Sequence, residues 1–195
     1  MPKAVKIDIF SETIYRSAGA TAAAQKNNQA FIDAQNLHLG TTKSDDPWKV
    51  DLVKFRAYLR KKFHVQTAYY FLGVYDIAQN QMYKAIQEVG YILIFREHGL
   101  AQTGIKKGNV DTDIVFTIMQ QLLDVVEFDD VVLVSGDGDY FKMVDYLIKK
   151  NRFETLLVPR LRGMSSLYKR LPDRYKTFLD TKDIKRKIAY VKEGE

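Results

Sequence analysis

The chain has 195 residues and a formal net charge of +6, and 46% of its residues are hydrophobic. This length is typical of one domain with a hydrophobic core of its own. The sequence has no apolar run of about 18 residues to span a membrane, and its N-terminus lacks a secretory signal, so we expect a cytoplasmic protein. The absence of cysteine excludes disulfides, thiolate metal sites and a cysteine nucleophile. A metal site would therefore use oxygen ligands or the three histidines.

Charged residues are unevenly distributed along the chain. Basic residues outnumber acidic ones in residues 1–100 and 151–195, whereas acidic residues outnumber basic ones in residues 101–150. An acidic segment between two basic ones suits a site that binds cations and attracts a polyanion. A surface charge that falls unevenly without any function explains the same composition, so the charge pattern alone does not decide the function.

Apolar segments of strand length alternate with segments of helical periodicity. The predicted strands are residues 29–34, 67–75, 91–95, 130–135 and 154–159. The predicted helices are residues 49–63, 77–89, 109–128 and 140–150. Residues 96–109 contain three glycines and no clear period, which predicts a loop. The alternation favours an α/β fold of three layers, α/β/α, with a mainly parallel central sheet of about five or six strands.

The two ends of the chain differ from this pattern. Residues 1–28 form an N-terminal extension in which the alternation of VKIDIF fits an edge strand and an Ala-rich stretch fits a short helix. Residues 181–195 form a basic segment in which Ile184, Ile188 and Val191 recur at helical spacing. This amphipathic segment would pack on the core or on a second copy of the chain, so a homo-oligomer is one expectation.

Polar residues follow the predicted strands at their carboxyl ends. In a parallel sheet, ligands bind outside this edge, where the chain turns toward the next helix. The stretch FIDAQN places Asp33 and Asn36 there, LVSGDGD places Ser135, Asp137 and Asp139 in the same layer, and GNVDTDIVF places Asp111 and Asp113 at the start of a helix. We therefore expect these acids to face one crevice, although turns and the helix dipole also favour Asp at such positions.

Several ionised carboxylates in one crevice would repel each other strongly, and the repulsion would raise their pKa values. A divalent cation removes this conflict. Mg²⁺ and Mn²⁺ prefer oxygen ligands, and Mg²⁺ characteristically completes its shell with water and substrate phosphates. Each acid alone is better explained as a cap or a turn residue, but their joint placement at strand ends favours a metal site.

Four motifs occur in order along the chain: IDAQN, KKGNVDTDI, LVSGDGDYFKMVDYL and VPR...SSL...DRYKTFLD. With these motifs and intervals, residues 29–180 resemble the NYN domain, a family of the PIN-like superfamily that includes bacterial LabA-like proteins. The resemblance implies a Rossmann-like α/β/α fold and metal-dependent cleavage of RNA, with Mg²⁺ or Mn²⁺ as the cofactor.

The resemblance also implies roles for individual residues. The catalytic and metal-binding acids of the family match Asp33, Asp111, Asp137 and Asp139. Asp113 matches a position that often holds a second acid, and Asn36 matches an asparagine suited to orient a carboxylate or a phosphate. Two residues depart from the family pattern, since Ala34 stands where Gly is more usual and Tyr140 where Phe is usual. Neither departure removes an acid.

Basic residues near the predicted site are candidates for binding RNA. They are Lys106, Lys107, Arg160, Arg162, Lys169, Arg170 and Arg174. Guanidinium groups suit bidentate contacts with phosphate, and neighbouring aromatic rings would stack the bases of single-stranded RNA. Ser135 is a further candidate, through a hydrogen bond to the scissile phosphate. For any one of the basic residues, a solvated surface position is the simpler explanation.

Other functions explain the sequence less well. DTDIV and SGDGDYF look like motifs of a haloacid dehalogenase-type phosphatase, but only 23 residues separate Asp113 from Asp137, and the first motif does not end the first strand. The three histidines fit no zinc-binding spacing, and no G-x-G-x-x-G follows the first strand. An RNA-binding or regulatory NYN module with weak or no catalysis remains the alternative, although a scaffold has no physical reason to keep a repulsive acid cluster.

Overall fold

The computed structural model describes residues 26–96 and 110–191. The strands are β1 (Asn28–Asp33), β2 (Val65–Leu72), β3 (Ile92–Phe95), β4 (Val131–Val134), β5 (Phe153–Val158) and β6 (Lys176–Phe178). The α-helices are α1 (Ala34–Thr42), α2 (Leu52–Phe63), α3 (Asn80–Glu88), α4 (Val110–Leu123), α5 (Phe141–Lys149) and α6 (Lys182–Ile188). The strand and helix expected within residues 1–28, and nearly all of the predicted loop 96–109, lie outside the described residues. None of the helices in the described ranges is long and apolar enough to cross a membrane.

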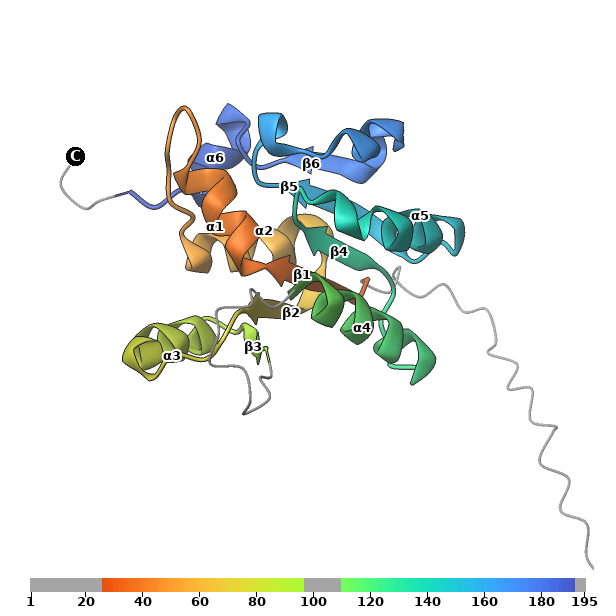
Figure 1. Ribbon diagram of the computed structural model, residues 1–195, viewed down its shortest axis with the longest axis horizontal. Helices are drawn as coiled ribbons and strands as arrows, with labels where there is room; N and C mark the ends of the chain where they lie inside the picture. The colour runs from red at the N-terminus through yellow and green to blue at the C-terminus, as the bar shows by residue number, and fades with distance from the viewer. Residues whose placement is uncertain (1–25, 97–109, 192–195) are drawn as a thin grey trace, which may run out of the picture.

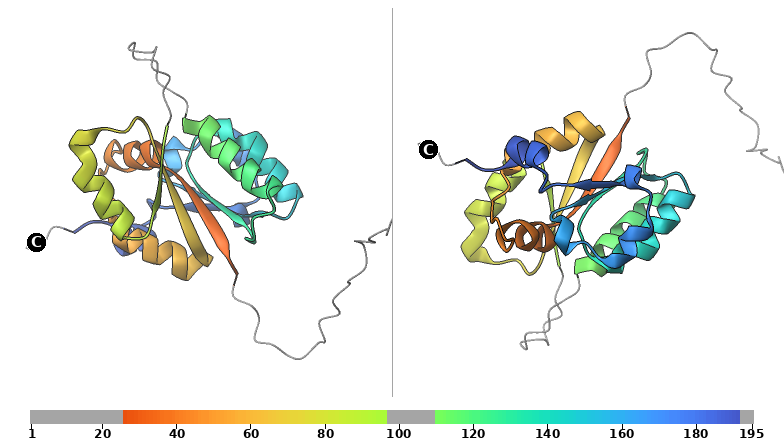
Figure 2. Two further views of the ribbon diagram at one scale, coloured as in Figure 1. Left: turned by 90° about the horizontal axis from the view of Figure 1, so that it is seen from below. Right: turned by 90° about the horizontal axis from the view of Figure 1, so that it is seen from above.

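The six strands form one sheet in the order β3-β2-β1-β4-β5-β6, and all neighbouring strands are parallel (Figure 1). Helices α1, α2, α3 and α6 cover one face of the sheet, and α4 and α5 cover the other (Figure 2). The predicted three-layer α/β/α fold with a mainly parallel sheet is confirmed. Because helices cover both faces, β1 and β4 are buried throughout; β4 is wholly apolar, and β1 is apolar in its middle at residues 30–32.

Successive residues of a strand point to opposite faces of the sheet, so the core has two halves. On β1, Ala30 and Ile32 pack with the cluster under α1 and α2, whereas Phe31 between them packs with the cluster under α4 and α5. On α4, Ile114 and Ile118 are four residues apart and both fully buried, because they lie on the helix face that covers the sheet.

The five predicted strands and four predicted helices are all present, with ends shifted by a few residues. The sequence reasoning missed α1, whose residues have little apolar periodicity. Asp33 starts this helix by accepting a hydrogen bond of 2.8 Å from the backbone N–H of Asn36, which is the usual role of an N-cap. Strand β6 was also missed, because three residues at the edge of a sheet are too few to show a period.

The described part of the C-terminal segment, residues 181–191, packs on the core of its own chain. Helix α6 lies against α2, and Ile188 at its end is fully buried. The carbonyl of Ile188 accepts a hydrogen bond of 2.8 Å from Asp51, and Tyr190 donates one of 2.8 Å to Lys49. Of the two packing modes expected for this amphipathic segment, the structure has the intramolecular one, and a homo-oligomer stays a prediction.

The strand order reverses between the two central strands. From β1 the chain adds β2 and β3 on one side, and it then adds β4, β5 and β6 on the other side of β1. At such a switch point the loops after the two central strands diverge and leave a crevice at the carboxyl edge of the sheet. Asp33 ends β1, and the turn that begins at Ser135 and carries Asp137 follows β4, so Asp33 and Asp137 border this crevice.

Candidate metal centre

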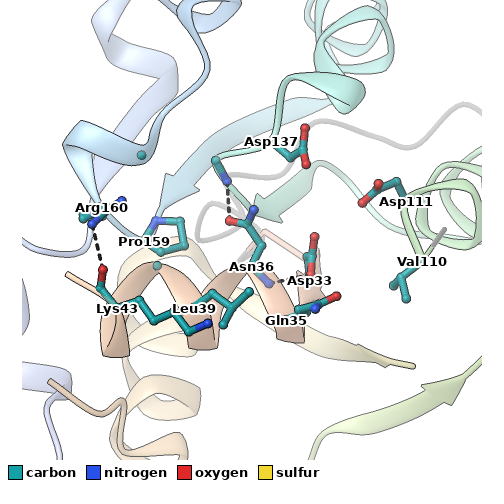
Figure 3. Close-up of a pocket in the computed structure, with 13 residues that line it drawn as sticks. Asp33, Gln35, Asn36, Leu39, Lys43, Val110, Asp111, Asp137, Pro159 and Arg160 are labelled. Carbon is teal, nitrogen blue, oxygen red and sulfur yellow. Dashed lines mark hydrogen bonds between the residues drawn. The ribbon is translucent and has the colours of Figure 1, made fainter. Parts of the chain in front are cut away.

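Asp33 stands at the end of β1 and is only 5% exposed. One of its carboxylate oxygens accepts the hydrogen bond from the N–H of Asn36 that caps α1. While the backbone of Asn36 donates to Asp33, its side-chain oxygen accepts a hydrogen bond of 2.8 Å from the N–H of Gly136 in the turn after β4 (Figure 3). Asn36 therefore orients Asp33 through its backbone, while its side chain holds the turn that carries the next acids.

The turn after β4 is stabilised by its own side chains. Ser135 is fully buried, and its hydroxyl oxygen accepts a hydrogen bond of 3.1 Å from the N–H of Asp137. Asp137 in turn accepts one of 3.1 Å from the N–H of Asp139 and so caps the 3₁₀ helix η2 (Gly138–Tyr140). Since Ser135 supports the turn, contact with a scissile phosphate stays a prediction for this residue.

The two glycines of SGDGD are explained by close packing and not by a left-handed backbone. Among the described glycines only Gly90 has a positive φ. A Cβ on Gly138 would lie 2.4 Å from the hydroxyl oxygen of Ser165, and one on Gly136 would lie 3.2 Å from the carbonyl oxygen of Gly163. The segment that follows β5 therefore presses against this turn.

Further hydrogen bonds hold that segment against the turn. Ser165 donates its backbone N–H to the carbonyl of Gly136 at 2.9 Å. Tyr168, which is fully buried, donates its hydroxyl to the carbonyl of Asp137 at 2.6 Å. The backbone that carries Asp137 and Asp139 thus continues from β4 and packs against residues 163–168.

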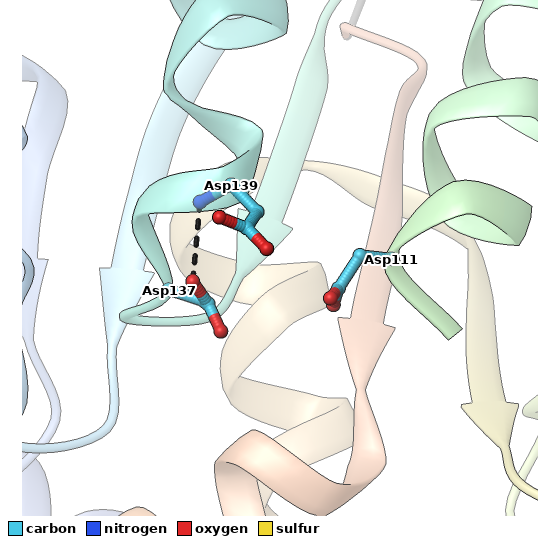
Figure 4. Close-up of side chains that lie close together, drawn as sticks. All are labelled: Asp111, Asp137 and Asp139. Atoms are coloured by element: carbon cyan, nitrogen blue, oxygen red, sulfur yellow. Dashed lines mark hydrogen bonds between the residues drawn. The ribbon is translucent and has the colours of Figure 1, made fainter. Parts of the chain in front are cut away.

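Asp111 lies in the first turn of α4, on the other side of the crevice. Carboxylate oxygens of Asp111, Asp137 and Asp139 all lie within 4.8 Å of one another (Figure 4). We call these three residues the acid cluster. Asp33 and Asp113 are not members of this group. Residues two apart on a helix point in different directions, which explains why Asp113 does not join Asp111.

Tyr140 links Asp33 to the acid cluster, and the sequence reasoning gave this residue no role. Its side chain is fully buried, and its hydroxyl lies 3.2 Å from a carboxylate oxygen of Asp33 and at shorter distance from one of Asp111. Burial and the two neighbouring carboxylates raise the pKa of Tyr140, so the phenol keeps its proton and acts as the donor. The sequence gives two signs of this role: Tyr140 directly follows Asp139, and it stands where Phe is usual in the family that the motifs resemble.

The environment of Asp33 and of Asp111 opposes the ionisation of these two carboxyl groups. Burial raises the pKa of Asp33 above its usual 3.8, and the charges of Asp111 and Asp137 add to the effect. Burial also raises the pKa of Asp111, with further contributions from Asp137 and Asp139. Clustered carboxylate oxygens are the donor set that a hard divalent cation prefers. The three oxygen donors of the acid cluster fit Mg²⁺ or Mn²⁺.

A cavity of about 690 Å³ extends from these acids toward the loop after β5. Asp33, Asp111 and Asp137 line one end, and Lys43 and Arg160 line the other (Figure 3). The guanidinium of Arg160 donates a hydrogen bond of 3.1 Å to the carbonyl of Lys43, which ties the end of α1 to this loop. Lys43 was not expected from the sequence, because it ends a helix that the sequence reasoning missed.

Of the other residues predicted to bind RNA, those that the structure describes do not line the cavity. Arg162 forms an exposed ion pair of 2.8 Å with Asp45. Lys169 and Arg170 are exposed on the 3₁₀ helix η4 (Ser166–Arg170), and the guanidinium of Arg170 lies 5.2 Å from the ring centre of Phe141. Lys106 and Lys107 are outside the described residues. RNA binding by these residues stays a prediction.

Fold and site together define an α/β protein with a carboxylate centre at the switch point of a parallel sheet. A family model described as the NYN domain matches residues 29–180. The chain therefore belongs to the NYN domain family, as its motifs predicted.

The chain is also similar to one curated protein and to one solved structure. The chain is 24% identical over 136 residues to the low amplitude and bright protein LabA of Synechococcus elongatus, a match that covers 65% of this chain and 70% of LabA. A solved structure of a protein of unknown function from Vibrio parahaemolyticus superposes with a TM-score of 0.65 at 21% identity, over 87% of this chain and all of the other. The similarity to the Vibrio parahaemolyticus structure supports the fold.

Proposed function

We propose that this protein is a metal-dependent ribonuclease that hydrolyses phosphodiester bonds within single-stranded RNA. The observation that carries the proposal is the acid cluster, in which three carboxylates from two separate elements lie within 4.8 Å of one another. Membership of the NYN family supports it, because this family belongs to the PIN-like nucleases.

The acid cluster is the proposed site of one or two divalent cations. Asp111, Asp137 and Asp139 would hold Mg²⁺ or Mn²⁺, and Asp33 belongs to the same site because Tyr140 links it to Asp111. A divalent cation, when bound, polarises the phosphoryl group and promotes deprotonation of a water molecule. Asp113 is near enough in sequence to assist from the first turn of α4, but its position outside the cluster gives it a secondary role.

The residues of the chain itself would position the RNA. Lys43 and Arg160, at the far end of the cavity, supply positive charge for a phosphate next to the scissile one. Arg162, Lys169 and Arg170 lie further out and would contact the strand as it leaves the cavity. Asn36 and Ser135 would position the protein's own acids, since both make hydrogen bonds to the turn that carries Asp137.

The proposal is tested by incubating the full chain with end-labelled single-stranded RNA in Mn²⁺ or Mg²⁺ and mapping the product ends. We expect internal cleavage that EDTA abolishes. Asp137→Asn should lose nearly all activity, whereas Asp124→Asn, which changes an exposed acid at the end of α4, should retain it. Full activity in EDTA, or in Asp137→Asn, would contradict the metal mechanism.

RNA binding without cleavage would favour the alternative, a regulatory NYN module. Equilibrium binding to the same RNA distinguishes the two outcomes, because a regulatory module binds with the affinity of an enzyme but leaves the strand intact. Hydrolysis of p-nitrophenyl phosphate without RNA cleavage would instead favour a phosphatase.

A further inference from the structure

Neither the residues next to Tyr140 in the sequence nor the proposed chemistry requires a polar side chain at this position. Its ring is fully buried in the core half under α4 and α5, together with Ile114, Val144 and Tyr168. A phenylalanine ring would fill the same space. The hydroxyl is therefore the part of Tyr140 that needs an explanation.

The hydroxyl of Tyr140 lies between two carboxylates from different elements. It is 3.2 Å from Oδ2 of Asp33, at the end of β1, and it also bonds Oδ1 of Asp111, in the first turn of α4. The other oxygen of Asp33 accepts the N–H of Asn36 at 2.8 Å. Both oxygens of Asp33 are thus engaged by the protein, which makes Asp33 a fixed point to which Tyr140 connects Asp111.

We propose that the Tyr140 hydroxyl is a positioning group for the metal centre, which holds the Asp111 carboxylate toward Asp137 and Asp139 and couples it to Asp33. This inference rests on the cation binding of the proposed function, but not on RNA cleavage. The ring is fixed by its packing, so the hydroxyl has one position, and an outer group of this kind orients a ligand before the metal arrives. Tyr140 follows Asp139 directly, so one turn supplies two of the acids and the group that orients the third.

The test is Mn²⁺ binding to the full chain without RNA, measured by calorimetry for the wild type and for Tyr140→Phe. We expect the dissociation constant to rise by about 10-fold or more, as is usual when a hydrogen-bond partner of a metal ligand is lost. The matched control is Tyr91→Phe, because Tyr91 is also buried and donates its hydroxyl to the carbonyl of Leu52 at 2.9 Å, on another side of the molecule. This control should leave the dissociation constant unchanged.

The melting temperature in metal-free buffer separates a positioning role from a structural one. If a hydroxyl has only a structural role, its removal, in Tyr140→Phe or in Tyr91→Phe, would shift the melting temperature and leave the Mn²⁺ affinity unchanged. The combination with Asp33→Asn adds a further check. Because Asp33 and Tyr140 act on Asp111 through one chain of contacts, the double variant should lose less affinity than the product of the two single losses.

The outcomes separate this inference from the proposed function. Wild-type affinity in Tyr140→Phe, or an equal loss in Tyr91→Phe, would overturn the positioning role even if the wild type cleaves RNA. A wild type that binds Mn²⁺ but does not cleave RNA would contradict the nuclease, while a weakened Tyr140→Phe would still support the positioning role. A wild type that does not bind Mn²⁺ would overturn both.

Discussion

The side-chain oxygen of Asn36 accepts a hydrogen bond of 2.8 Å from the backbone N–H of Gly136 and so joins two segments 100 residues apart. This contact bridges the first turn of α1 and the turn after β4. These two turns directly follow the two central strands, β1 and β4. Gly136 is buried, so its N–H depends on a protein acceptor. The contact holds Asp137 at a fixed position relative to Asp33.

Replacing Asn36 by alanine should therefore reduce both stability and metal binding. The loss of an acceptor for a buried N–H costs about 1–3 kcal/mol of unfolding free energy. Asn28→Ala is the matched control, because Asn28 bonds Phe63 and Asp130 at the opposite end of β1. Both variants should melt earlier, but Asn36→Ala alone should weaken Mn²⁺ binding by calorimetry. Equal Mn²⁺ affinity in the two variants would show that the bridge does not position the site.

Gly138→Ala should destabilise the turn that carries Asp137 and Asp139. The added methyl would lie 2.4 Å from the hydroxyl oxygen of Ser165, so the Ser165 side chain, the turn or the neighbouring segment must move. Overpacking of this kind costs about 1–3 kcal/mol, measured by urea unfolding. Gly73→Ala has no atom within 4 Å of the new methyl and should change the unfolding free energy little. If Gly138→Ala is as stable as the wild type, the close approach does not constrain this position.

Asp33→Asn should stabilise the metal-free protein at neutral pH. Burial raises the pKa of Asp33 in the folded state, so the folded protein binds this proton more tightly than the unfolded chain. The unfolding free energy therefore falls as the pH rises from about 3.8 through the folded pKa, and it stays lowered at higher pH. Asparagine is an equally good N-cap and removes this penalty.

Thermal melting of Asp33→Asn and wild type across this pH range provides the measurement. The gain in melting temperature should be largest at neutral pH and should vanish toward low pH, where the wild-type carboxyl is protonated. In Mn²⁺ the order should reverse, because the wild type gains binding energy that the variant lacks. A variant that is less stable than the wild type in metal-free buffer at neutral pH would contradict the role of burial.

Lys43→Ala and Arg160→Ala should weaken RNA binding without changing Mn²⁺ affinity. The two cations line the cavity away from the acid cluster, where one phosphate contact each is expected. Binding to uncleaved RNA is measured in the Asp137→Asn background at several salt concentrations. Each loss should reduce the salt slope by about 0.7, the value for one phosphate of a single strand. The control is Lys149→Ala, because Lys149 pairs with Asp145 at the far end of α5, and an equal effect there would argue for unspecific attraction.

The sequence predicted the class of fold and the acids of the candidate site, because both follow from local patterns. Apolar strands that are buried on both faces form continuous runs, and the acids stand where those runs stop. Asp33 and Asp137 are detectable for this reason. Helix α1 was missed since its start depends on the cap of Asp33 and its packing on Gly40, where a Cβ would lie 2.6 Å from Pro159. Neither feature has a periodic signal.

Only the tertiary structure decided which acids meet and what holds them. The sequence placed five aspartates at one edge of the sheet, but the direction of each side chain depends on helix phase and on contacts between distant segments. The structure joins Asp111 to Asp137 and Asp139, leaves Asp113 outside the cluster, and connects Asp33 through Tyr140. The two glycines of SGDGD are constrained by a neighbour that follows the next strand, Gly138 more tightly than Gly136. Such requirements arise from packing between elements, and the order of residues in one segment does not contain them.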